Sequence, residues 1–261
     1  MKIYDCFTFF NELEILDLRL KELNNHVDYF VLVEATLTHT GKSKDLIFEK
    51  NKNKFSEYLD KIIHIKVDDL PNYNDFEDIW VPENFQRNCI TRGLINAEET
   101  DIIIVSDIDE IPRPSAISVG VKGLEIHKWV SCEQNLFYYY VNCAQNQLWR
   151  GSVLSKRKDV LIPQDLRKAR QVIPHLKNAG WHYSYMGGSD KIIQKLQNIA
   201  DTPDDYRGLK KEDIQYKIET QKDLFDRRDD FAKKTIIPLD ARAPEHIKWF
   251  IEKYPSFYYN E

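Results

Sequence analysis

IIIVSDIDE, at residues 102–110, is the stretch that decides the fold of this chain. Its first four residues are apolar, three of them isoleucines, and they predict a buried strand that ends at Ser106. Asp107 and Asp109 follow at once. Two carboxylates at the end of a buried strand lose hydration and require a compensating positive charge. A divalent cation with oxygen ligands, Mg²⁺ or Mn²⁺, is their usual partner, and a solvated loop is the alternative for an isolated D-x-D motif.

The segments before this stretch alternate between strand and helix patterns. We expect strands at 2–10, 28–35, 61–67 and 101–106, and helices at 12–23, 49–60 and 83–99. This β-α-β-α-β-α-β order predicts a parallel sheet with right-handed crossovers. Neither a G-x-G-x-x-G nor a P-loop motif occurs, so the chain shows no dinucleotide or P-loop chemistry.

Beyond Pro112 and Pro114 the texture of the sequence changes, and tryptophan and tyrosine become frequent. Further strands are expected at 149–156 and 181–186, and helices at 163–170, 189–199, 210–225 and 243–253. No internal repeat, low-complexity tract or Gly/Ser linker separates the two halves. The sequence therefore predicts one domain with a mixed sheet in its second half, and aromatic side chains in that half suit sugar contacts as well as the core.

Composition excludes several classes of protein. The chain has 261 residues, a net charge of −5 and a pI of about 5.9, which does not suit a nucleic-acid-binding surface. No run of 18 apolar residues predicts a membrane span, and the N-terminal apolar stretch is too short for a signal peptide, so we expect a cytoplasmic protein. The four cysteines form no C-x-x-C pair and are expected to be buried free thiols rather than zinc ligands.

Several polar residues converge at one edge of the predicted sheet. The carboxyl ends of parallel strands lie together, and open α/β sheets bind their ligands there. The first strand brings Thr8 to this edge and the second brings Glu34. The helix over 83–99 runs antiparallel to the strand after it, so its N-terminal turn brings Arg87 to the same edge. An arginine there suits a bound anion, and a surface ion pair is the alternative.

AGWHYSYMGGSDKIIQK, at residues 179–195, is the second informative stretch. Gly187 and Gly188 precede an expected helix, and glycines in that position expose backbone N–H groups that suit a phosphate. His182 is a candidate metal ligand or phosphate contact, or else a histidine packed in the core. Asp190 opens the helix, either as an ordinary N-terminal acid or as a general base.

Taken together, five stretches of the chain resemble glycosyltransferase family 17. They are FFNELEILDLRLKEL (9–23), VDYFVLVEATLTHTGKSKDLIF (27–48), ENFQRN (83–88), DIIIVSDIDEIPRPSAI (101–117) and GWHYSYMGG (180–188). Their order along the chain makes the resemblance far more specific than a D-x-D motif alone. It runs from about residue 3 to residue 200, and the last sixty residues carry no motif of the family.

The resemblance implies a GT-A-type nucleotide-sugar transferase fold, an α/β architecture with a mostly parallel central sheet, helices on both faces and a mixed second half. Residues 1–261 would form a single glycosyltransferase domain, with a nucleotide-sugar-binding half at 1–110 and an acceptor-side half with C-terminal helices at 111–261. The implied activity is an inverting, metal-dependent hexosyl transfer of the β-1,4-N-acetylglucosaminyltransferase kind. The donor would be a UDP-sugar, UDP-N-acetylglucosamine, and the acceptor a glycan hydroxyl.

The resemblance also assigns roles to the residues at the active edge. Asp107, Asp109 and His182 would hold Mn²⁺ or Mg²⁺. The donor would be bound by Thr8, Glu34, Arg87, Asp107, Gly187 and Gly188. A carboxylate would deprotonate the acceptor hydroxyl while the metal neutralises the departing UDP, and Asp190 is the first candidate for this base and Glu133 the second.

Two rival interpretations remain. A haloacid-dehalogenase-type phosphatase also places D-x-D after an apolar strand, but its motif does not continue with Glu110 and Ile111 and usually lies near the N-terminus. A non-catalytic glycan-binding module on a transferase fold would be expected to lose Asp107 or Asp109, which are both intact here. Release of UDP from a UDP-sugar distinguishes an enzyme from a binding module.

Overall fold

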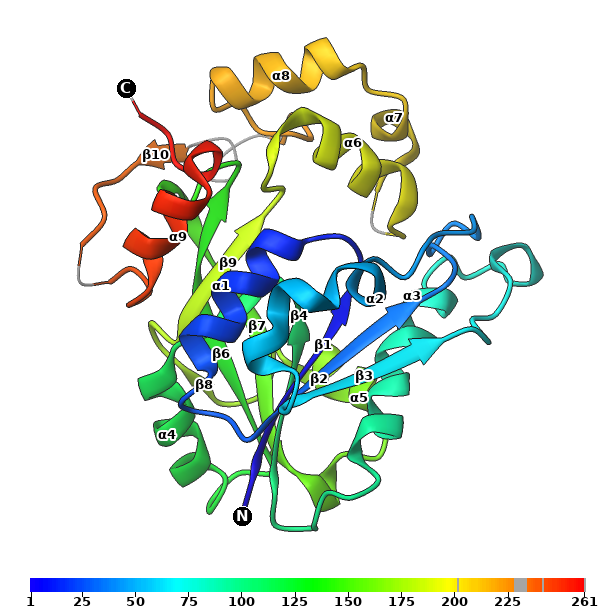
Figure 1. Ribbon diagram of the computed structural model, residues 1–261, viewed down its shortest axis with the longest axis vertical. Coiled ribbons are helices and arrows are strands. Elements are labelled where there is room, and N and C mark those ends of the chain that lie inside the picture. The colour runs from blue at the N-terminus through cyan, green and yellow to red at the C-terminus, as the bar shows by residue number, and fades with distance from the viewer. Residues whose placement is uncertain (201, 228–233, 241, 261) are drawn as a thin grey trace.

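The computed structural model describes residues 1–200, 202–227, 234–240 and 242–260 (Figure 1). The strands are β1 (Ile3–Phe9), β2 (Tyr29–Ala35), β3 (Ile62–Val67), β4 (Ile102–Asp107), β5 (Glu110–Pro112), β6 (Trp129–Tyr138), β7 (Cys143–Lys156), β8 (His175–Leu176), β9 (Gly180–Ser184) and β10 (Lys234–Ile236). The α-helices are α1 (Leu13–Leu23), α2 (Ile47–Asn51), α3 (Val81–Asn88), α4 (Pro114–Gly123), α5 (Pro163–Ala169), α6 (Gly188–Asn198), α7 (Asp204–Arg207), α8 (Lys211–Glu219) and α9 (Ile247–Lys253). Short 3₁₀ helices cover Lys52–Tyr58, Tyr73–Asp75, Cys89–Leu94, Arg157–Asp159 and Pro255–Phe257.

The first four strands form the predicted parallel sheet. β1 pairs with both β2 and β4, so that Cys6 lies opposite Val31 on one side and Val105 on the other. β3 pairs with β2 in the same direction. The four strands therefore end at one edge, which places Thr8 beside Asp107 in register. The parallel first half of the sheet is confirmed.

The second half of the sheet is mixed, as expected. The sheet order is β3-β2-β1-β4-β7-β6-β9-β5, with β10 paired to β7 and β8 paired to β6. β7 runs antiparallel to β4 and to β6, whereas β9 runs parallel to β6 and carries β5 on its far side. Because β5 pairs with β9 immediately after the D-x-D turn, the partner of Glu110 across the two strands is His182.

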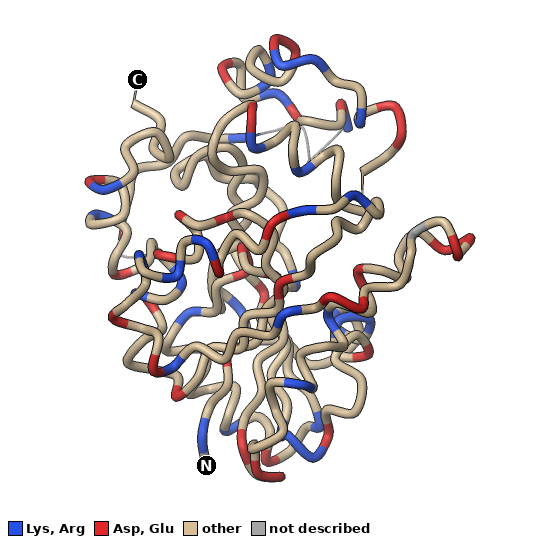
Figure 2. Tube along the Cα trace, turned by 45° about the vertical axis from the view of Figure 1, so that its right-hand side comes forward, with Lys and Arg blue, Asp and Glu red and all other residues tan. Residues whose placement is uncertain are grey.

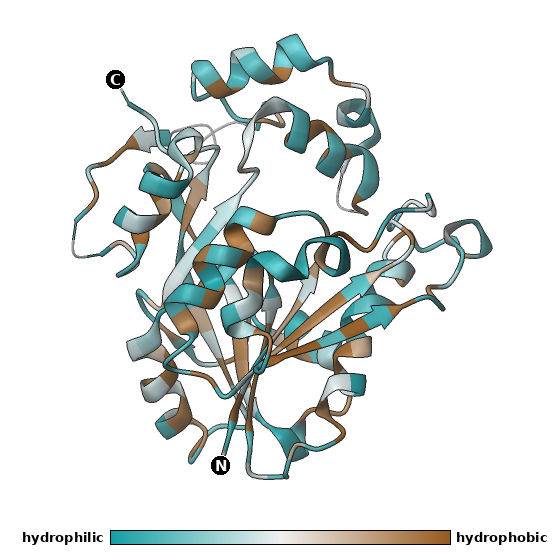
Figure 3. Ribbon diagram, viewed as in Figure 1, coloured by the Kyte–Doolittle hydropathy of each residue, from teal (hydrophilic) through white to brown (hydrophobic). Residues whose placement is uncertain are grey.

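Helices cover both faces of the sheet because the strand residues alternate between two cores. Phe7, Phe30 and Ile104 pack on the face covered by α1, α2, α4 and α9. Cys6, Val31 and Val105 face the opposite way, toward α5 and the segment 89–94. In Figure 3 the apolar colour is concentrated in the strands and the polar colour on the outer helices. The α/β fold with helices on both faces is thus confirmed.

Beyond the carboxyl ends of the parallel strands lies a cap made of α6, α7 and α8 (Figure 1). α6 and α8 pack against each other through a third apolar cluster that also includes tyrosines at the end of β6. Acidic and basic residues are interspersed along the trace in Figure 2. No helix in the described ranges is long and apolar enough to cross a membrane.

The structure departs from the predicted element boundaries in a few places. The expected helix over 49–60 changes to 3₁₀ geometry after α2, with Phe55 in a non-helical conformation. The expected helix over 83–99 becomes 3₁₀ after α3, and Gly93 there approaches β2 so closely that an added Cβ would lie 2.5 Å from a Val31 methyl carbon. All four cysteines are buried free thiols, as expected.

Candidate active site

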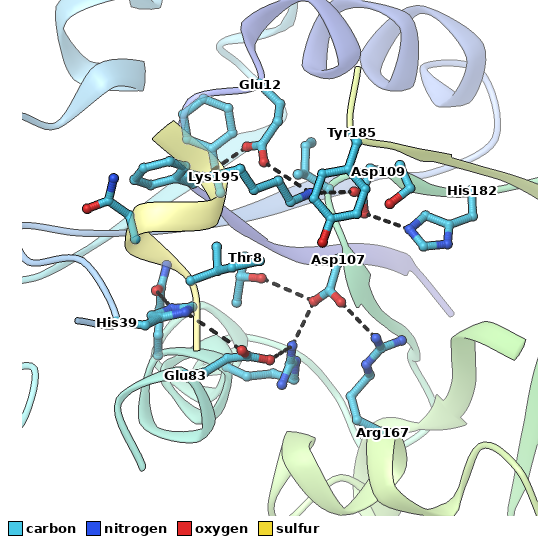
Figure 4. Close-up of a pocket in the computed structure, with 18 of the residues that line it drawn as sticks. Thr8, Glu12, His39, Glu83, Asp107, Asp109, Arg167, His182, Tyr185 and Lys195 are labelled. Atoms are coloured by element: carbon cyan, nitrogen blue, oxygen red, sulfur yellow. Dashed lines mark hydrogen bonds and ion pairs between the residues drawn. The ribbon is translucent and has the colours of Figure 1, made fainter. Parts of the chain in front are cut away.

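A cavity of about 580 Å³ lies at the carboxyl edge of the parallel strands. Its walls come from the ends of β1 and β4, from α3 and α5, from the end of β9 and from the cap. Figure 4 shows Asp107 and Asp109 at its centre, with Arg167, His182 and Lys195 directed toward them. The volume lies within the range of small-molecule sites, which is about 300–1,000 Å³.

The D-x-D turn is held from the core side by Arg19 of α1. This guanidinium is fully buried and forms a two-pronged ion pair with Asp5, at 2.7 Å from Nε and 2.6 Å from Nη2. Nη2 also donates to the Ser106 hydroxyl. Nη1 donates to the backbone carbonyl oxygens of residues 107, 108 and 110 at 2.9–3.0 Å. One arginine therefore fixes the backbone path that presents both aspartates.

Asp107 receives two guanidinium groups from different helices. Arg87 Nη2 and Arg167 Nη2 each lie 2.7 Å from a carboxylate oxygen of Asp107, and the Thr8 hydroxyl donates at 3.3 Å. Burial alone would raise the pKa of Asp107, but Arg167 and Arg87 outweigh it and hold the pKa well below its usual value. The carboxylate remains 32% exposed, toward the cavity. Asp107 is thus a permanent anion at the cavity floor.

Asp109 has a different set of partners. Lys195 Nζ of α6 donates to its Oδ2 at 2.9 Å, and His182 Nε2 lies 3.5 Å from its Oδ1. Burial opposes ionisation, but Lys195 and then His182 lower the pKa of Asp109 below its usual range. Lys195 Nζ also lies 3.9 Å from Glu12 Oε1, so one ammonium group connects two cavity carboxylates.

Glu110, the third acid of the stretch, is fully buried and does not line the cavity. Its carboxylate accepts hydrogen bonds from Arg167 at 2.7 and 2.9 Å and from Trp149 Nε1 at 2.6 Å. Glu110 therefore orients Arg167 toward Asp107 rather than meeting a ligand itself.

Five of the residues predicted from sequence come together in the cavity wall, namely Thr8, Arg87, Asp107, Asp109 and His182. Glu34 does not join them, because it is fully buried and accepts hydrogen bonds from the Phe48 backbone and from His64 Nε2 at 3.1 and 3.2 Å. The expected donor contact of Glu34 is therefore not supported by its position.

Gly187 and Gly188 also lie outside the cavity wall. Both have positive φ values, 89° and 83°, so they form the left-handed turn that leads from β9 into α6. Their role in the structure is to change the direction of the chain, and their amides do not line the cavity. The predicted phosphate contact of these glycines has no support in this arrangement.

Neither predicted base lines the cavity. Asp190 is 71% exposed and pairs with Lys211 of α8 at 2.7 Å. It lies five positions before Lys195 on α6, about 140° around the helix axis, and therefore on a different face. Glu133 lies 3.5 Å from His175 Nε2, on the side of β6 that pairs with β8. The positions of both residues give no support to a role as the general base.

Arg167, Arg170 and Lys195 are among the cavity residues that sequence reasoning missed. Arg167 lies in α5 and Arg170 directly follows it. This helix comes after an antiparallel strand, so the rule for parallel strand ends did not reach the two arginines. Their signal was the basic run RKAR at 167–170. Lys195 was within the quoted stretch at 179–195, five residues after Asp190 on the same helix, but no spacing rule singled it out.

The acidic groups fit a divalent cation that is shared with a ligand. Within the described residues, no three His, Cys, Asp or Glu side chains converge to hold a metal by themselves. The 3.5 Å between Asp109 Oδ1 and His182 Nε2 nevertheless lets one ion contact both atoms. Mg²⁺ commonly takes only one or two protein ligands and completes its shell with phosphates and water. The pair therefore fits a nucleotide-bound metal better than a permanent structural one.

Solved structures show only distant similarity. The galactosyltransferase LgtC with donor and acceptor sugar analogs is 11% identical, with a TM-score of 0.37, over all of this chain and 98% of that one. Staphylococcus aureus TarS, residues 1–349, is 13% identical with a TM-score of 0.39, over 84% of this chain and 71% of that one.

The sequence comparisons are more specific. The β-1,4-mannosyl-glycoprotein 4-β-N-acetylglucosaminyltransferases of Rattus norvegicus and Homo sapiens are 30% and 31% identical over 122 and 113 residues. These matches cover 44% and 41% of this chain, and the chain spans only about a fifth of each relative, 22% and 21%. The profile of glycosyltransferase family 17 matches residues 1–238. Since that match covers most of the chain, the protein belongs to glycosyltransferase family 17.

Proposed function

We propose that this protein is a glycosyltransferase that moves N-acetylglucosamine from UDP-N-acetylglucosamine to a hydroxyl group of a glycan acceptor, with inversion at the anomeric carbon. The observation that carries the proposal is the pair Asp107 and Asp109, held on one rigid turn at the floor of a cavity that is also lined by Arg87, Arg167 and Lys195. The choice of donor sugar follows the names of the two mammalian relatives.

A nucleoside diphosphate suits the charge distribution of this cavity. Arg87, Arg167 and Lys195 each already contact an aspartate, but Arg170 makes no carboxylate contact among the described residues, and its buried Nε has no hydrogen-bond partner. Burial and then the charge of Arg167 lower the pKa of Arg170, so its cationic form is less favourable here than in water. A diphosphate would offset the repulsion between Arg167 and Arg170, and its oxygens would accept hydrogen bonds from the Arg170 N–H groups that lack a partner in the described part of the chain.

A divalent cation would be held by Asp109 and His182, with Asp107 beside them, as the sequence predicts. When bound, it would neutralise negative charge on the leaving diphosphate. The residues of this chain perform the same electrostatic task from the other side, since the guanidinium groups of Arg167 and Arg170 are already in place before the donor arrives.

The transfer step requires a proton acceptor. The acceptor oxygen forms a bond to the anomeric carbon, the bond from that carbon to the diphosphate oxygen breaks, and its electron pair leaves with UDP. The proton of the hydroxyl passes to a carboxylate. Of the four carboxylates in the cavity wall, Asp107, Asp109 and Glu83 have basic partners within 3.0 Å. Glu12 has its nearest basic group at 3.9 Å, and we assign it the role of base.

The proposal is tested by incubating the protein with UDP-N-acetylglucosamine, Mn²⁺ and a panel of simple glycosides, and by following UDP release and product mass. Calorimetry with UDP, with and without EDTA, tests the donor site independently of the acceptor. Binding of UDP that weakens in EDTA is expected. Absence of UDP binding in either condition would contradict the proposal, because the D-x-D edge would then not be a nucleotide site.

A further inference from the structure

The cavity has a second end, which is aromatic and lies away from the arginines of α3 and α5. Its wall consists of Tyr138 at the end of β6, Tyr185 just after β9, and Phe225 beyond α8. The rings of Tyr138 and Tyr185 are stacked, with centroids 5.6 Å apart and planes 26° apart. Phe225 meets the Tyr185 ring edge-on, also at 5.6 Å. We call these three residues the aromatic wall.

Tyr185 is held next to the D-x-D turn in an uncommon backbone conformation. Its φ is 53°, in the left-handed region, which residues other than glycine seldom occupy and which is enriched at functional sites. Two residues earlier, the backbone N–H of Tyr183 donates to the carbonyl oxygen of Asp109 at 2.9 Å. Lys195 Nζ lies 5.3 Å from the centre of the Tyr185 ring (Figure 4). The aromatic wall therefore begins directly beside Asp109.

Polar groups border the aromatic wall. Arg227 Nη2 donates to the Tyr138 hydroxyl at 3.0 Å and to Asp223 at 2.8 Å, and the Arg227 guanidinium lies 5.2 Å from the Phe225 ring centre. Ser184 also lines the cavity here. Aromatic side chains next to fixed hydrogen-bonding groups are the combination that matches a pyranose ring, which has an apolar face and a rim of hydroxyls.

We propose that the aromatic wall is the subsite for the pyranose ring of the acceptor, with Arg227 and Ser184 contacting its hydroxyls. This inference rests on the proposed function, since it needs a donor on the other side of Asp109. The two ends of the cavity differ in chemistry as that arrangement requires. The end at Arg87, Arg167 and Arg170 is cationic and suits a diphosphate, whereas the aromatic wall is bordered by Arg227, which is paired with Asp223, and suits a neutral sugar.

The test compares Phe225→Ala and Tyr185→Ala with wild type, and uses Tyr216→Ala as a matched control because Tyr216 is 53% exposed on α8. UDP affinity is measured by calorimetry with Mn²⁺. Binding of the methyl β-D-pyranosides of mannose, glucose and galactose is measured by saturation-transfer NMR in the presence of UDP. We expect both wall variants to weaken pyranoside binding roughly 3- to 10-fold, as loss of an aromatic contact implies, with UDP affinity unchanged.

Three results would overturn the inference. The first is an equal loss of UDP affinity in the wall variants, which would make the wall part of the donor site. The second is unchanged pyranoside binding, and the third is absence of pyranoside binding to the wild type. If Tyr185→Ala does not fold, Phe225→Leu removes an aromatic ring while keeping most of its bulk, and it carries the same test. Failure of the proposed function is distinguishable, because it appears as absence of UDP binding to the wild type.

Discussion

Lys195 Nζ lies 2.9 Å from Asp109 Oδ2, although the two residues are 86 positions apart in the sequence. The cap is thereby attached to the D-x-D turn by a single ammonium group. The Lys195 ammonium group neutralises the negative charge of Asp109, which a bound cation would otherwise do.

Removing this ammonium group should change metal and donor binding in opposite directions. In Lys195→Gln, Asp109 loses its partner, so we expect tighter Mn²⁺ binding without nucleotide and weaker UDP binding, because one positive charge near the phosphates is gone. Mn²⁺ titration by electron paramagnetic resonance and UDP calorimetry measure the two effects. Lys191→Gln is the control, because Lys191 lies on the same helix as Lys195 but pairs with Glu14 of α1. If Mn²⁺ affinity and UDP affinity changed in the same direction, Lys195 and the cation would not be competing for Asp109.

Asp109→Ala should abolish the metal dependence of UDP binding while leaving the fold nearly intact. The carboxylate is only 4% exposed and is one of two side chains placed to contact a shared ion. We expect EDTA to have no effect on UDP affinity in the variant, and transfer to be lost. Circular dichroism checks the fold. A variant whose UDP affinity still drops in EDTA would place the metal elsewhere.

Arg87→Lys and Arg167→Lys should each weaken UDP binding. Nη2 of Arg87 donates to Glu83 and Asp107, and Nη2 of Arg167 donates to Asp107 and Glu110. Lysine cannot reproduce the planar fork of N–H donors that an arginine offers. The expected loss is about 1.5–3 kcal/mol, typical for a hydrogen bond to a charged group. Calorimetry is the measurement. Arg92→Lys, in an exposed ion pair with Asp69, is the matched control and should bind UDP normally.

Glu12→Gln should keep UDP affinity and lower transfer by roughly 10²- to 10⁴-fold, the range for loss of a general base. Asp190→Asn removes a carboxylate that faces α8 instead of the cavity, so it should transfer at the normal rate. Initial rates at saturating donor compare the two variants. A slow Asp190→Asn beside an active Glu12→Gln would reverse the assignment.

Asp107→Asn should make the free energy of unfolding less dependent on pH in the acidic range. The folded-state pKa of Asp107 is lowered, so its ionised form contributes stability that is fully present above the unfolded-state pKa of about 3.9 and is lost as pH falls below it. The variant should be less stable than wild type near neutral pH, and the difference should shrink below about pH 4. Urea unfolding at several pH values measures this, with exposed Asp60→Asn as control. A constant difference would contradict the linkage.

Much of the site was predictable because the parallel half of the sheet obeys a simple geometric rule. The strand ends at Thr8 and Asp107 meet where the parallel sheet places them. Arg87 also reaches Asp107, but it does so from the last turn of α3 and not from the expected N-terminal turn of a helix over 83–99. His182 could be placed through its strand and the resemblance. The same rule failed for Glu34, because the end of a strand can turn its side chain inward, and burial among Phe48 and His64 cannot be inferred from one strand.

The rest of the site depends on contacts that leave no local pattern. Arg167 is oriented toward Asp107 by the buried Glu110, and no spacing rule connects an arginine to acids that lie 57 and 60 positions earlier in the chain. To know that Lys195 and not Asp190 faces the cavity, one must know how α6 is oriented about its own axis. That orientation is set by apolar packing against α8, which is a tertiary property.

Because of Arg19, the D-x-D turn becomes ordered when the protein folds and not when the donor binds. Its three backbone contacts and its pair with Asp5 belong to the folded core, so the loop entropy of the D-x-D turn is lost once, when the chain folds. Each arriving donor then meets a turn that has no conformational freedom left to lose, and its binding energy remains available for the transfer step.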